Sequence, residues 1–344
     1  MPHSVDSGLM QRRHARFAAV AFLAALGFGA GNAAAAEHVK IGLLLTAGSG
    51  PVYVAQEKGY FRAEGLDVEL VPFDAGQPVA VATVSGDVDF GTAGVTSALY
   101  TLCAEGALRI IAGSTQDRPG FPAAGLMVSK QAYDAGLKSF KDLGGHSTAL
   151  TQVGSTYHYA FALVASKYHV DMKTVRTLPL QSLANDAAAV IGGQADTAML
   201  TANQISPILA QDKARLLGWV GEEVPWQVAM MWTSTKTANT RRATVERFLS
   251  AVRHGSHDVD AAFVGPDGKR KDGPTAPEIT AIIAKYIKLP VEKTSKLIGY
   301  TDPDLRINEK DVANQLAWYH AQGMIKQKVT IGQVIDKRYA KAMP

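Results

Sequence analysis

The chain has 344 residues, 47% of them hydrophobic and 19% charged, and its formal net charge is +4. This composition is typical of a folded globular protein and argues against long disordered regions or several membrane spans. The single cysteine, Cys103, excludes a disulfide within the chain and a cysteine-based zinc cluster. Because 35 Lys and Arg nearly balance 31 Asp and Glu, no nucleic acid or other polyanion is expected as a partner. The length is sufficient for two domains, each with its own core.

Residues 1–36 have the three parts of a secretory signal peptide. Arg12, Arg13 and Arg16 precede the apolar segment 17–30, and the alanines at 34–36 offer small residues to a signal peptidase. The apolar segment is shorter than the ~20 residues that cross a bilayer, so it predicts a removed signal and not an anchor.

We therefore expect a mature chain that begins at Glu37 and lies in the periplasm. Met10 is an alternative start, because residues 1–9 add nothing that such a signal requires. No cysteine stands at the predicted cleavage site, so a lipoprotein is not expected. Removal of residues 1–36 takes away three arginines and Asp6, which lowers the net charge from +4 to +2.

The first half of the remaining chain alternates apolar strands with helices. Residues 39–45 predict a buried strand, and residues 51–65 predict a helix that Pro51 opens and Gly65 ends. Further strands are predicted at 66–73, 88–92, 108–112 and 125–129, and further helices at 78–85 and 95–104. This order predicts a mostly parallel sheet with helices on both faces.

A second series of the same kind follows. Strands are predicted at 147–152, 196–200, 215–220 and 227–233, and helices at 137–143, 155–168, 183–191 and 203–210. From residue 240 the composition predicts mainly helices, apart from a polar break at 265–273. The fold class is therefore α/β, with two units of similar plan.

Three predicted junctions between a strand and a helix carry small residues, many with hydroxyl groups. They lie at 46–51, 92–96 and 154–156. Free backbone N–H groups and the positive end of the helix dipole make such junctions good sites for anions or carbonyl groups. Each junction alone is explained better by an ordinary helix cap, because Ser, Thr and Gly are the residues that caps use. Because ligands of open α/β sheets bind beyond the carboxyl ends of the strands, the three together predict one binding cleft.

Three longer segments carry a family resemblance. They are VYVAQEKGYFRAEGLDVELVPF at 52–73, SGDVDFGTAGVTSAL at 85–99 and GLKSFKDLGGHSTALTQVGSTYHYAFAL at 136–163. In this order they resemble the periplasmic solute-binding proteins of ABC importers in the nitrate, taurine, alkanesulfonate and thiamine-precursor group. The resemblance covers most of residues 39–235, and its motifs are specific for the family but not for the ligand.

The resemblance implies a type II periplasmic binding protein fold, in which two α/β lobes joined by hinge strands close around a small molecule. Lobe I is expected to comprise residues 37–124 and 230–344, and lobe II residues 125–229. The closed form would present its ligand to the transmembrane subunits of an ABC permease. The resemblance further implies a monomer without a cofactor.

The resemblance also places ligand-binding residues at the cleft loops of both lobes. The predicted set is Thr46, Gly48, Ser49, Tyr53, Thr92, Ala93, Gly94 and Thr96 from lobe I, and Ser155, Thr156, Tyr157, His158, Thr201, Asn203 and Trp226 from lobe II.

The cleft loops supply no Lys or Arg, which leaves N–H groups, hydroxyl groups and Arg118 to neutralise an anion. Tyr53, Tyr157 and Trp226 suit a ligand with a flat or apolar body, although each is equally suited to packing between elements. The expected ligand is a small organic anion, a sulfonate or a carboxylate, and a neutral heterocycle is the alternative.

Other candidate residues have simpler explanations. His254 and His257 lie three residues apart on a predicted helix, but no third ligand is in view, so no metal is expected. Cys103 lies in an apolar helix and is expected in the core. No phosphate-binding loop, serine-hydrolase elbow or zinc-protease motif occurs. A binding protein is therefore favoured, and an enzyme or a ligand-sensing module on the same scaffold is the alternative.

Overall fold

The computed structural model describes Met1 and residues 35–344. Nearly all of the predicted signal peptide lies outside these residues. Contacts divide the chain into two units, Met1–Ala36 and Glu37–Pro344, and only the second is described below. Among the described residues, no helix has both the length and the apolar character needed to cross a membrane.

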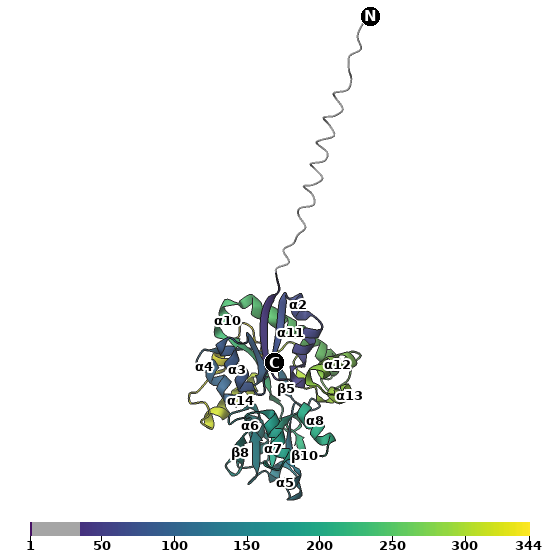
Figure 1. Cartoon of the computed structure of the whole chain (residues 1–344). Coiled ribbons are helices and arrows are strands. Elements are labelled where there is room, and N and C mark those ends of the chain that lie inside the picture. Colours follow the sequence, from purple (N-terminus) through teal and green to yellow (C-terminus); the bar gives the residue numbers. More distant parts are fainter. Residues whose placement is uncertain (2–34) are drawn as a thin grey trace. The chain divides into compact units, whose positions relative to one another are not determined.

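One mixed sheet, with its helices, forms the first lobe, the upper one in Figure 1. Its strand order is β2-β1-β3-β12-β4. The strands are β1 (Glu37–Leu43), β2 (Leu66–Pro72), β3 (Phe90–Gly94), β4 (Leu108–Gly113) and β12 (Ala229–Ser234). Two apolar cores cover its faces: one packs under α1 (Gly50–Glu57), α11 (Arg242–Phe263) and α12 (Ala276–Ile287), the other under α3 (Gly76–Ser85) and α4 (Ser97–Ala104).

A second mixed sheet forms the second lobe, with strand order β10-β6-β9-β7-β8. Its strands are β6 (Ala124–Ser129), β7 (Ser147–Leu150), β8 (Arg176–Pro179), β9 (Thr197–Thr201) and β10 (Ala214–Trp219). The helices α6 (Thr156–Lys167), α7 (Leu183–Ile191) and α8 (Ala202–Ala210) each follow a strand or its loop. The α/β fold with two lobes, implied by the family resemblance, is thus confirmed.

Both sheets are mixed: four of the five strands in each run in one direction, as predicted, and one strand runs against them. In the first lobe β12 is antiparallel to both of its neighbours, and in the second lobe β6 is antiparallel to both of its own. These are the two strands that enter a sheet directly from the other lobe. Because they enter at the edge where the other strands end, they run in the opposite direction.

Two predicted elements are interrupted for identifiable reasons. The helix predicted over 51–65 breaks into α1 and α2 (Tyr60–Ala63), because Gly59 adopts a left-handed conformation with φ of 74°. The strand predicted over 227–233 is divided at Val228 into β11 (Trp226–Gln227) and β12. The first part pairs with another sheet, so the chain changes partners at this residue.

A small third sheet, of order β11-β5-β13, lies where the chain passes between the lobes. β5 (Thr115–Asp117) follows β4 of the first lobe, and β11 precedes β12 on the return. β13 (Tyr300–Thr301) comes from the C-terminal third and pairs with β5 on its other side. The predicted lobe boundaries at 124/125 and 229/230 adjoin these two passages, and we retain them as a working division.

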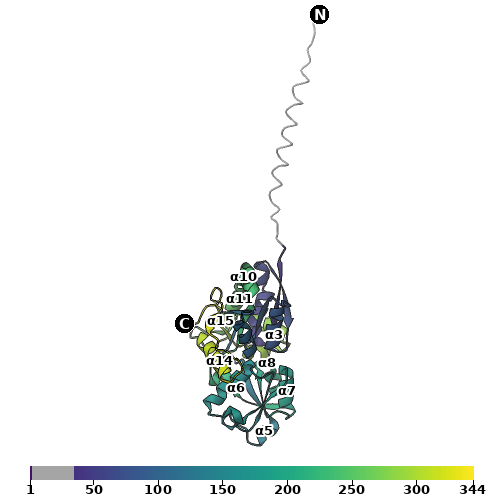
Figure 2. The same cartoon turned by 90° about the vertical axis from the view of Figure 1, so that its left-hand side faces the viewer.

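The remaining elements are short, except for one helix. That helix is α14 (Glu309–Ala321), which contacts α4 of the first lobe, α6 of the second lobe and β11. Figure 2 shows α14 beside α6. The short helices are α5 (Lys130–Asp134), α9 (Val220–Glu223), α10 (Thr235–Thr240), α13 (Val291–Thr294) and α15 (Ile331–Val334), with 3₁₀ turns η1 (Ala47–Ser49), η2 (Phe140–Asp142), η3 (Met172–Thr174) and η4 (Ser295–Leu297).

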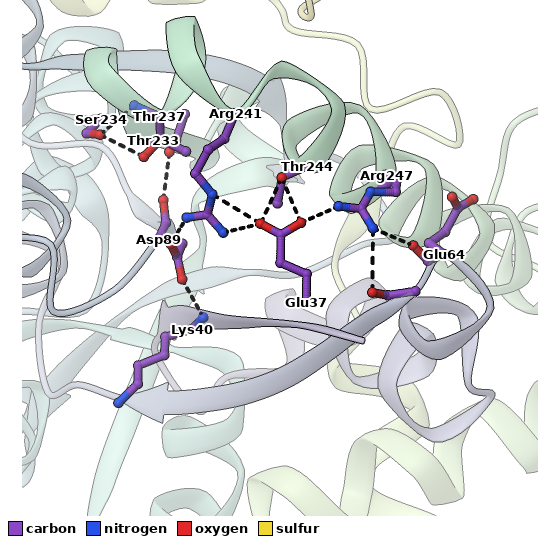
Figure 3. Close-up of polar contacts among 11 residues, drawn as sticks. Glu37, Lys40, Glu64, Asp89, Thr233, Ser234, Thr237, Arg241, Thr244 and Arg247 are labelled. Carbon is purple, nitrogen blue, oxygen red and sulfur yellow. Dashed lines mark hydrogen bonds and ion pairs between the residues drawn. The ribbon is translucent and has the colours of Figure 1, made fainter. Parts of the chain in front are cut away.

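A cluster of charges fastens the start of β1 to the long helix α11 (Figure 3). The carboxylate of Glu37 accepts hydrogen bonds from Arg241 (2.6 and 3.1 Å) and from the hydroxyl of Thr244 (3.0 Å), and it pairs with Arg247. Arg241 also pairs with Asp89, whose carboxylate accepts from the backbone N–H of Lys40 at 2.8 Å. Partial burial of Glu37 opposes its ionisation, but the hydrogen bonds and charge of these partners outweigh it and lower its pKa.

We predict that Glu37→Gln lowers the free energy of unfolding at pH 7 by about 1 kcal/mol, since solvent screens part of each ion pair. The lowered pKa means that this stabilisation is present at neutral pH and is lost as the pH falls through the folded-state pKa of Glu37. Denaturant titrations at pH 7 and about pH 3 measure both effects. The exposed Glu69 pairs with Lys40 at 3.3 Å, so Glu69→Gln is the matched control, with a change below about 0.5 kcal/mol. Equal losses in the two variants would contradict the prediction.

Candidate functional site

A cavity lies between the two lobes, where the strands of both sheets end. The centre of a water molecule can occupy about 90 Å³ of it. Residues after β1, β3, β7 and β9 line it from the two lobes, and Thr115 and Val228 line it from the passages between them. Leu297 and Gly299, from the C-terminal third, complete the wall.

The N-termini of five helices meet at this cavity. The first residues of α3, α6, α7 and α8 belong to its wall, and so does Thr96, the N-cap residue of α4. Thr96 caps α4 by accepting from the N–H of Leu99 at 3.1 Å, and Ser155 caps α6 by accepting from the N–H of His158 at 3.2 Å. Each N-terminus carries the positive end of a helix dipole and N–H groups without helical partners. The backbone therefore makes the cavity favourable for negative charge.

The side chains of the wall are uncharged. Every lining residue belongs to the described part of the chain, and none of them is Lys, Arg, His, Asp or Glu. Most polar lining residues are Ser or Thr, and Gln152 and Asn203 add amide groups. Leu44, Leu183 and Leu297 add apolar surface. Such a wall can donate hydrogen bonds to an oxyanion and contact an apolar group.

A family model described as "NMT1/THI5 like" matches residues 47–262. The chain belongs to this family. The family resemblance inferred from the sequence motifs is thereby confirmed.

This NMT1/THI5-like protein is similar in sequence to one curated binding protein and in fold to solved structures of others. "Putative binding protein YtlA" of Bacillus subtilis (strain 168) is 24% identical over 306 residues, which are 85% of this chain and 85% of YtlA. The solved structure of the alkanesulfonate-binding protein SsuA of Xanthomonas axonopodis pv. citri, bound to MOPS, has a TM-score of 0.70 and 20% identity over 88% of this chain and 99% of SsuA. The periplasmic aliphatic sulphonate binding protein SsuA of Escherichia coli has a TM-score of 0.66 and 19% identity, over 90% and 94% of the two chains.

All but three of the residues predicted to bind the ligand lie on the wall of the cavity. Those on the wall are Thr46, Gly48, Ser49, Thr92, Ala93, Gly94, Thr96, Ser155, Thr156, Tyr157, Thr201 and Asn203. Contact with a ligand stays a prediction for each of them. The three that the structure places elsewhere are Tyr53, His158 and Trp226, and each has a structural partner instead.

Tyr53 lies in the core of the first lobe, where its ring stacks on Tyr286 at 4.3 Å between centroids. Trp226 is buried between the lobes, and its indole N–H donates to Asp117 at 3.2 Å. His158 lies on the face of α6 that packs against Trp318, with 5.2 Å between the ring centroids. These three side chains pack in the core or between the lobes. Their positions in the sequence do not distinguish such packing from contact with a ligand.

His158 supports a cavity loop without reaching the cavity. Its Nδ1 accepts a hydrogen bond from the N–H of Gly154 at 3.1 Å, and Gly154 has φ of 80°, in the left-handed region. Burial lowers the pKa of His158 to about 4. The ring therefore stays neutral and keeps its acceptor nitrogen over the whole physiological range.

Arg118, which sequence reasoning offered as a partner for an anion, does not line the cavity. Its guanidinium lies 3.4 Å from the ring centroid of Tyr300 and donates to the carbonyl of Gly268 at 2.8 Å. The family motifs did not indicate the wall residues from the passage between lobes, such as Ser114 and Thr115. Thr151 and Gln152 lie one residue before the Gly-Ser-Thr junction, so the end of the predicted strand over 147–152 could have indicated them.

The two histidines and the cysteine that the sequence offered as other functional candidates pack against, or pair with, neighbouring side chains. Among the described residues no group of three potential metal ligands occurs; His257 lies 3.5 Å from Asp304, and His254 packs against the ring of Tyr60. Cys103 is fully buried in the first lobe, and burial raises its pKa to about 12. A thiol with this pKa is a poor nucleophile, so Cys103 acts as a core residue.

One buried acid close to the cavity has no partner. Asp186 lies one helical turn after the lining residue Leu183 and is 1% exposed. Within the described residues neither of its carboxyl oxygens has a hydrogen-bond partner. Burial raises its pKa to about 7. The carboxyl group of an aspartate in an unfolded chain has a pKa near 3.9. Between this value and about pH 7 the folded state therefore binds more protons than the unfolded state, and the free energy of unfolding falls as the pH rises.

We predict that Asp186→Asn removes much of this pH dependence. Between about pH 5 and pH 8 the wild type should lose on the order of 2 kcal/mol more unfolding free energy than the variant, because only the wild type must ionise a buried acid. Urea titrations at both pH values give the comparison. The exposed Asp134→Asn serves as the control and should follow the wild type. A variant that follows the wild type as closely as this control does would show that Asp186 is already ionised at pH 5.

Proposed function

We propose that this protein captures a small organic monoanion, a sulfonate or a carboxylate, in the cavity between its lobes. The observation that carries the proposal is the uncharged wall at which five helix N-termini meet. The backbone N–H groups and the Ser and Thr hydroxyls would hold the anionic head. Leu44, Leu183 and Leu297 would contact the apolar part of the ligand.

The absence of cationic side chains from the wall limits the charge of the ligand. Burial of an ion is costly unless its charge is compensated, and helix dipoles supply only partial charges. A monoanion fits this partial compensation, whereas a dianion such as sulfate or hydrogen phosphate would be left with uncompensated charge. Among the relatives, SsuA of Xanthomonas axonopodis pv. citri is described as bound to MOPS, a sulfonate.

The ligand would favour the closed arrangement of the lobes because both lobes contribute to its binding. Thr92 and Gly94 line the cavity from the first lobe, and Thr156 and Thr201 line it from the second. A ligand shifts such an equilibrium by the difference between its affinities for the closed and open states. We propose that the closed, monomeric protein, exported to the periplasm and cleaved before Glu37, delivers its ligand to the permease of an ABC importer.

The composition of the wall favours binding over catalysis. Cys103 and His158, which have nucleophilic and basic groups, lie outside it, and the pKa of each is shifted by burial in the direction that suppresses its charged form. The groups that remain, hydroxyls and amides, suit recognition of a ligand.

We predict that a small monoanion stabilises the protein, and that Thr156→Arg abolishes this effect. Thr156 lines the cavity and is 8% exposed, so an arginine there would fill the space of the ligand. A thermal-shift panel of taurine, alkyl and aryl sulfonates, aromatic carboxylates, nitrate, sulfate, phosphate and pyrimidines gives the measurement. A ligand at a hundred times its Kd adds about 2.7 kcal/mol to the unfolding free energy.

Ser166→Arg is the matched control, because Ser166 is an exposed residue near the other end of the same helix. This variant should respond to ligands like the wild type. Unchanged affinity in folded Thr156→Arg would remove this junction from the site. If no monoanion binds while a pyrimidine or a dianion does, the proposed ligand class is wrong; if nothing binds and turnover is detected, the importer function is wrong.

A further inference from the structure

Behind the cavity, the two lobes touch through backbone carbonyl groups. The hydroxyl of Thr156, in the second lobe, donates to the carbonyl of Val95, in the first lobe, at 2.7 Å. Close by, the N–H of Ser97 donates to the carbonyl of Gly154 at 2.9 Å. These two bonds join the loop after β3 to the loop before α6 without involving any charged group.

Glycines make this close approach possible on both sides. A Cβ atom at position 94 would lie 2.5 Å from the hydroxyl oxygen of Thr156, and one at position 154 would lie 2.2 Å from that of Ser97. Real Cβ atoms do not approach other atoms this closely, so a larger residue at 94 or 154 would force Thr156 or Ser97 to move. The contact therefore belongs to an arrangement in which the lobes are closed against each other.

Tyr319 lies at this contact, although it comes from the far C-terminal part of the chain. Its side chain is fully buried, and its hydroxyl lies 3.3 Å from the carbonyl of Val95 and 3.1 Å from the carbonyl of Ser155. The first carbonyl belongs to the first lobe and the second to the second lobe. One hydroxyl proton can thus be shared between a carbonyl of the first lobe and a carbonyl of the second.

The helix that carries Tyr319 is anchored to both lobes and to the strand between them. On α14, Asp311 accepts from the hydroxyl of Tyr159 of α6 at 2.9 Å and from the N–H of Gln227 of β11 at 2.8 Å. One turn later, Gln315 accepts from the hydroxyl of Tyr100 of α4 at 2.9 Å and donates to the carbonyl of Gln227 at 2.8 Å. Because these bonds hold α14 in place, the hydroxyl of Tyr319 stays where the two lobes meet.

We propose that Tyr319 is a positioning residue that latches the closed lobes and so raises ligand affinity without contacting the ligand. Opening of the cleft separates the carbonyls of Val95 and Ser155, and the hydroxyl then keeps one of its two acceptors at most. The latch favours the closed state in the absence of any ligand. Its effect on affinity rests on the proposed function, since a ligand gains from the latch only if it binds the closed state better.

The test measures closure of the full-length mature protein without ligand. Fluorophores are attached at Lys173→Cys in the second lobe and Lys236→Cys in the first, both exposed positions, while the buried Cys103 stays unlabelled. Polyethylene glycol is added as an osmolyte that is too large to enter the cleft, so that it drives water out and closes the lobes. Energy transfer between the fluorophores reports the ratio of closed to open molecules.

We expect Tyr319→Phe to lower the closed-to-open ratio about 3- to 10-fold at every osmolyte concentration, the loss of one buried hydrogen bond. Tyr53→Phe is the matched control: its hydroxyl is also buried and donates to Leu44 at 3.3 Å, but within one lobe. This control should close like the wild type. Far-ultraviolet circular dichroism confirms that each variant is folded.

If Tyr319→Phe closes like Tyr53→Phe, the contact persists in both states as a pivot, and the latch is refuted. This outcome is independent of the proposed function, which fails only if no compound of the panel binds the wild type. Where a compound does bind, its Kd should be higher for Tyr319→Phe than for the wild type, by at most the same 3- to 10-fold. The full factor is expected if the wild-type cleft is mostly open without ligand. If Tyr319→Phe lowers the closed-to-open ratio but leaves the Kd unchanged, the proposed effect of Tyr319 on affinity is refuted.

Discussion

Two short strands, β5 and β11, carry the chain from one lobe to the other and pair side by side, Trp226 opposite Asp117 and Gln227 opposite Gln116. This pairing fixes where the strands that follow can run. β6 and β12 leave it at the cleft and run away from the cleft into their sheets, antiparallel to their neighbours. The other strands consequently end at the cleft, and the helices that follow them begin there. Five helix N-termini therefore face one cavity as a consequence of the chain path, before any side chain is considered.

The passage between the lobes is held by buried polar groups that have partners. The carboxyl of Asp117 is fully buried and accepts from the N–H groups of Ala123 (3.0 Å) and Ala124 (3.2 Å) and from Trp226. Burial raises the pKa of Asp117 to about 7, although these N–H groups act in the opposite direction. The side-chain amide of Gln227 donates to the carbonyls of Thr115 in β5 and Ala229 in β12, and its oxygen accepts from the N–H of Asn308 at 3.1 Å. Buried networks with every member satisfied favour one arrangement of the backbone.

Local sequence signals predicted most strands and helices of the two large sheets and part of the cavity wall, because each depends on residues close together in the chain. The Thr-Ala-Gly segment at the end of β3 and the Gly-Ser-Thr junction at the start of α6 were found in this way, and both contribute residues to the cavity wall. The direction of β6 and β12 was not predicted, since it depends on the passage between sheets and not on the composition of the strands.

Side chains whose partners lie far away in the sequence were the hardest to predict. Trp226 precedes a strand at the cleft, as a ligand-covering residue would, but its partner is Asp117, more than a hundred residues earlier. Leu297 joins the wall because the C-terminal third folds back on the first lobe, and no pattern around it indicates a cleft. Tyr319 is a further case, with acceptors on residues 95 and 155.

An uncharged wall also affects how the empty protein behaves. If each lobe carried a cation toward the ligand, closure without the anion would bring like charges together at low dielectric. Here the charges are used elsewhere: Arg241 and Arg247 bind Glu37 at the far end of β1, and Arg118 stacks on Tyr300. The lobes can therefore meet through neutral groups such as Thr156 and the carbonyl of Val95. Repulsion does not hold the empty cleft open, so the balance between open and closed forms depends on weak, neutral contacts such as this one. A ligand bound by hydroxyls and N–H groups then needs only a modest difference in affinity to shift that balance.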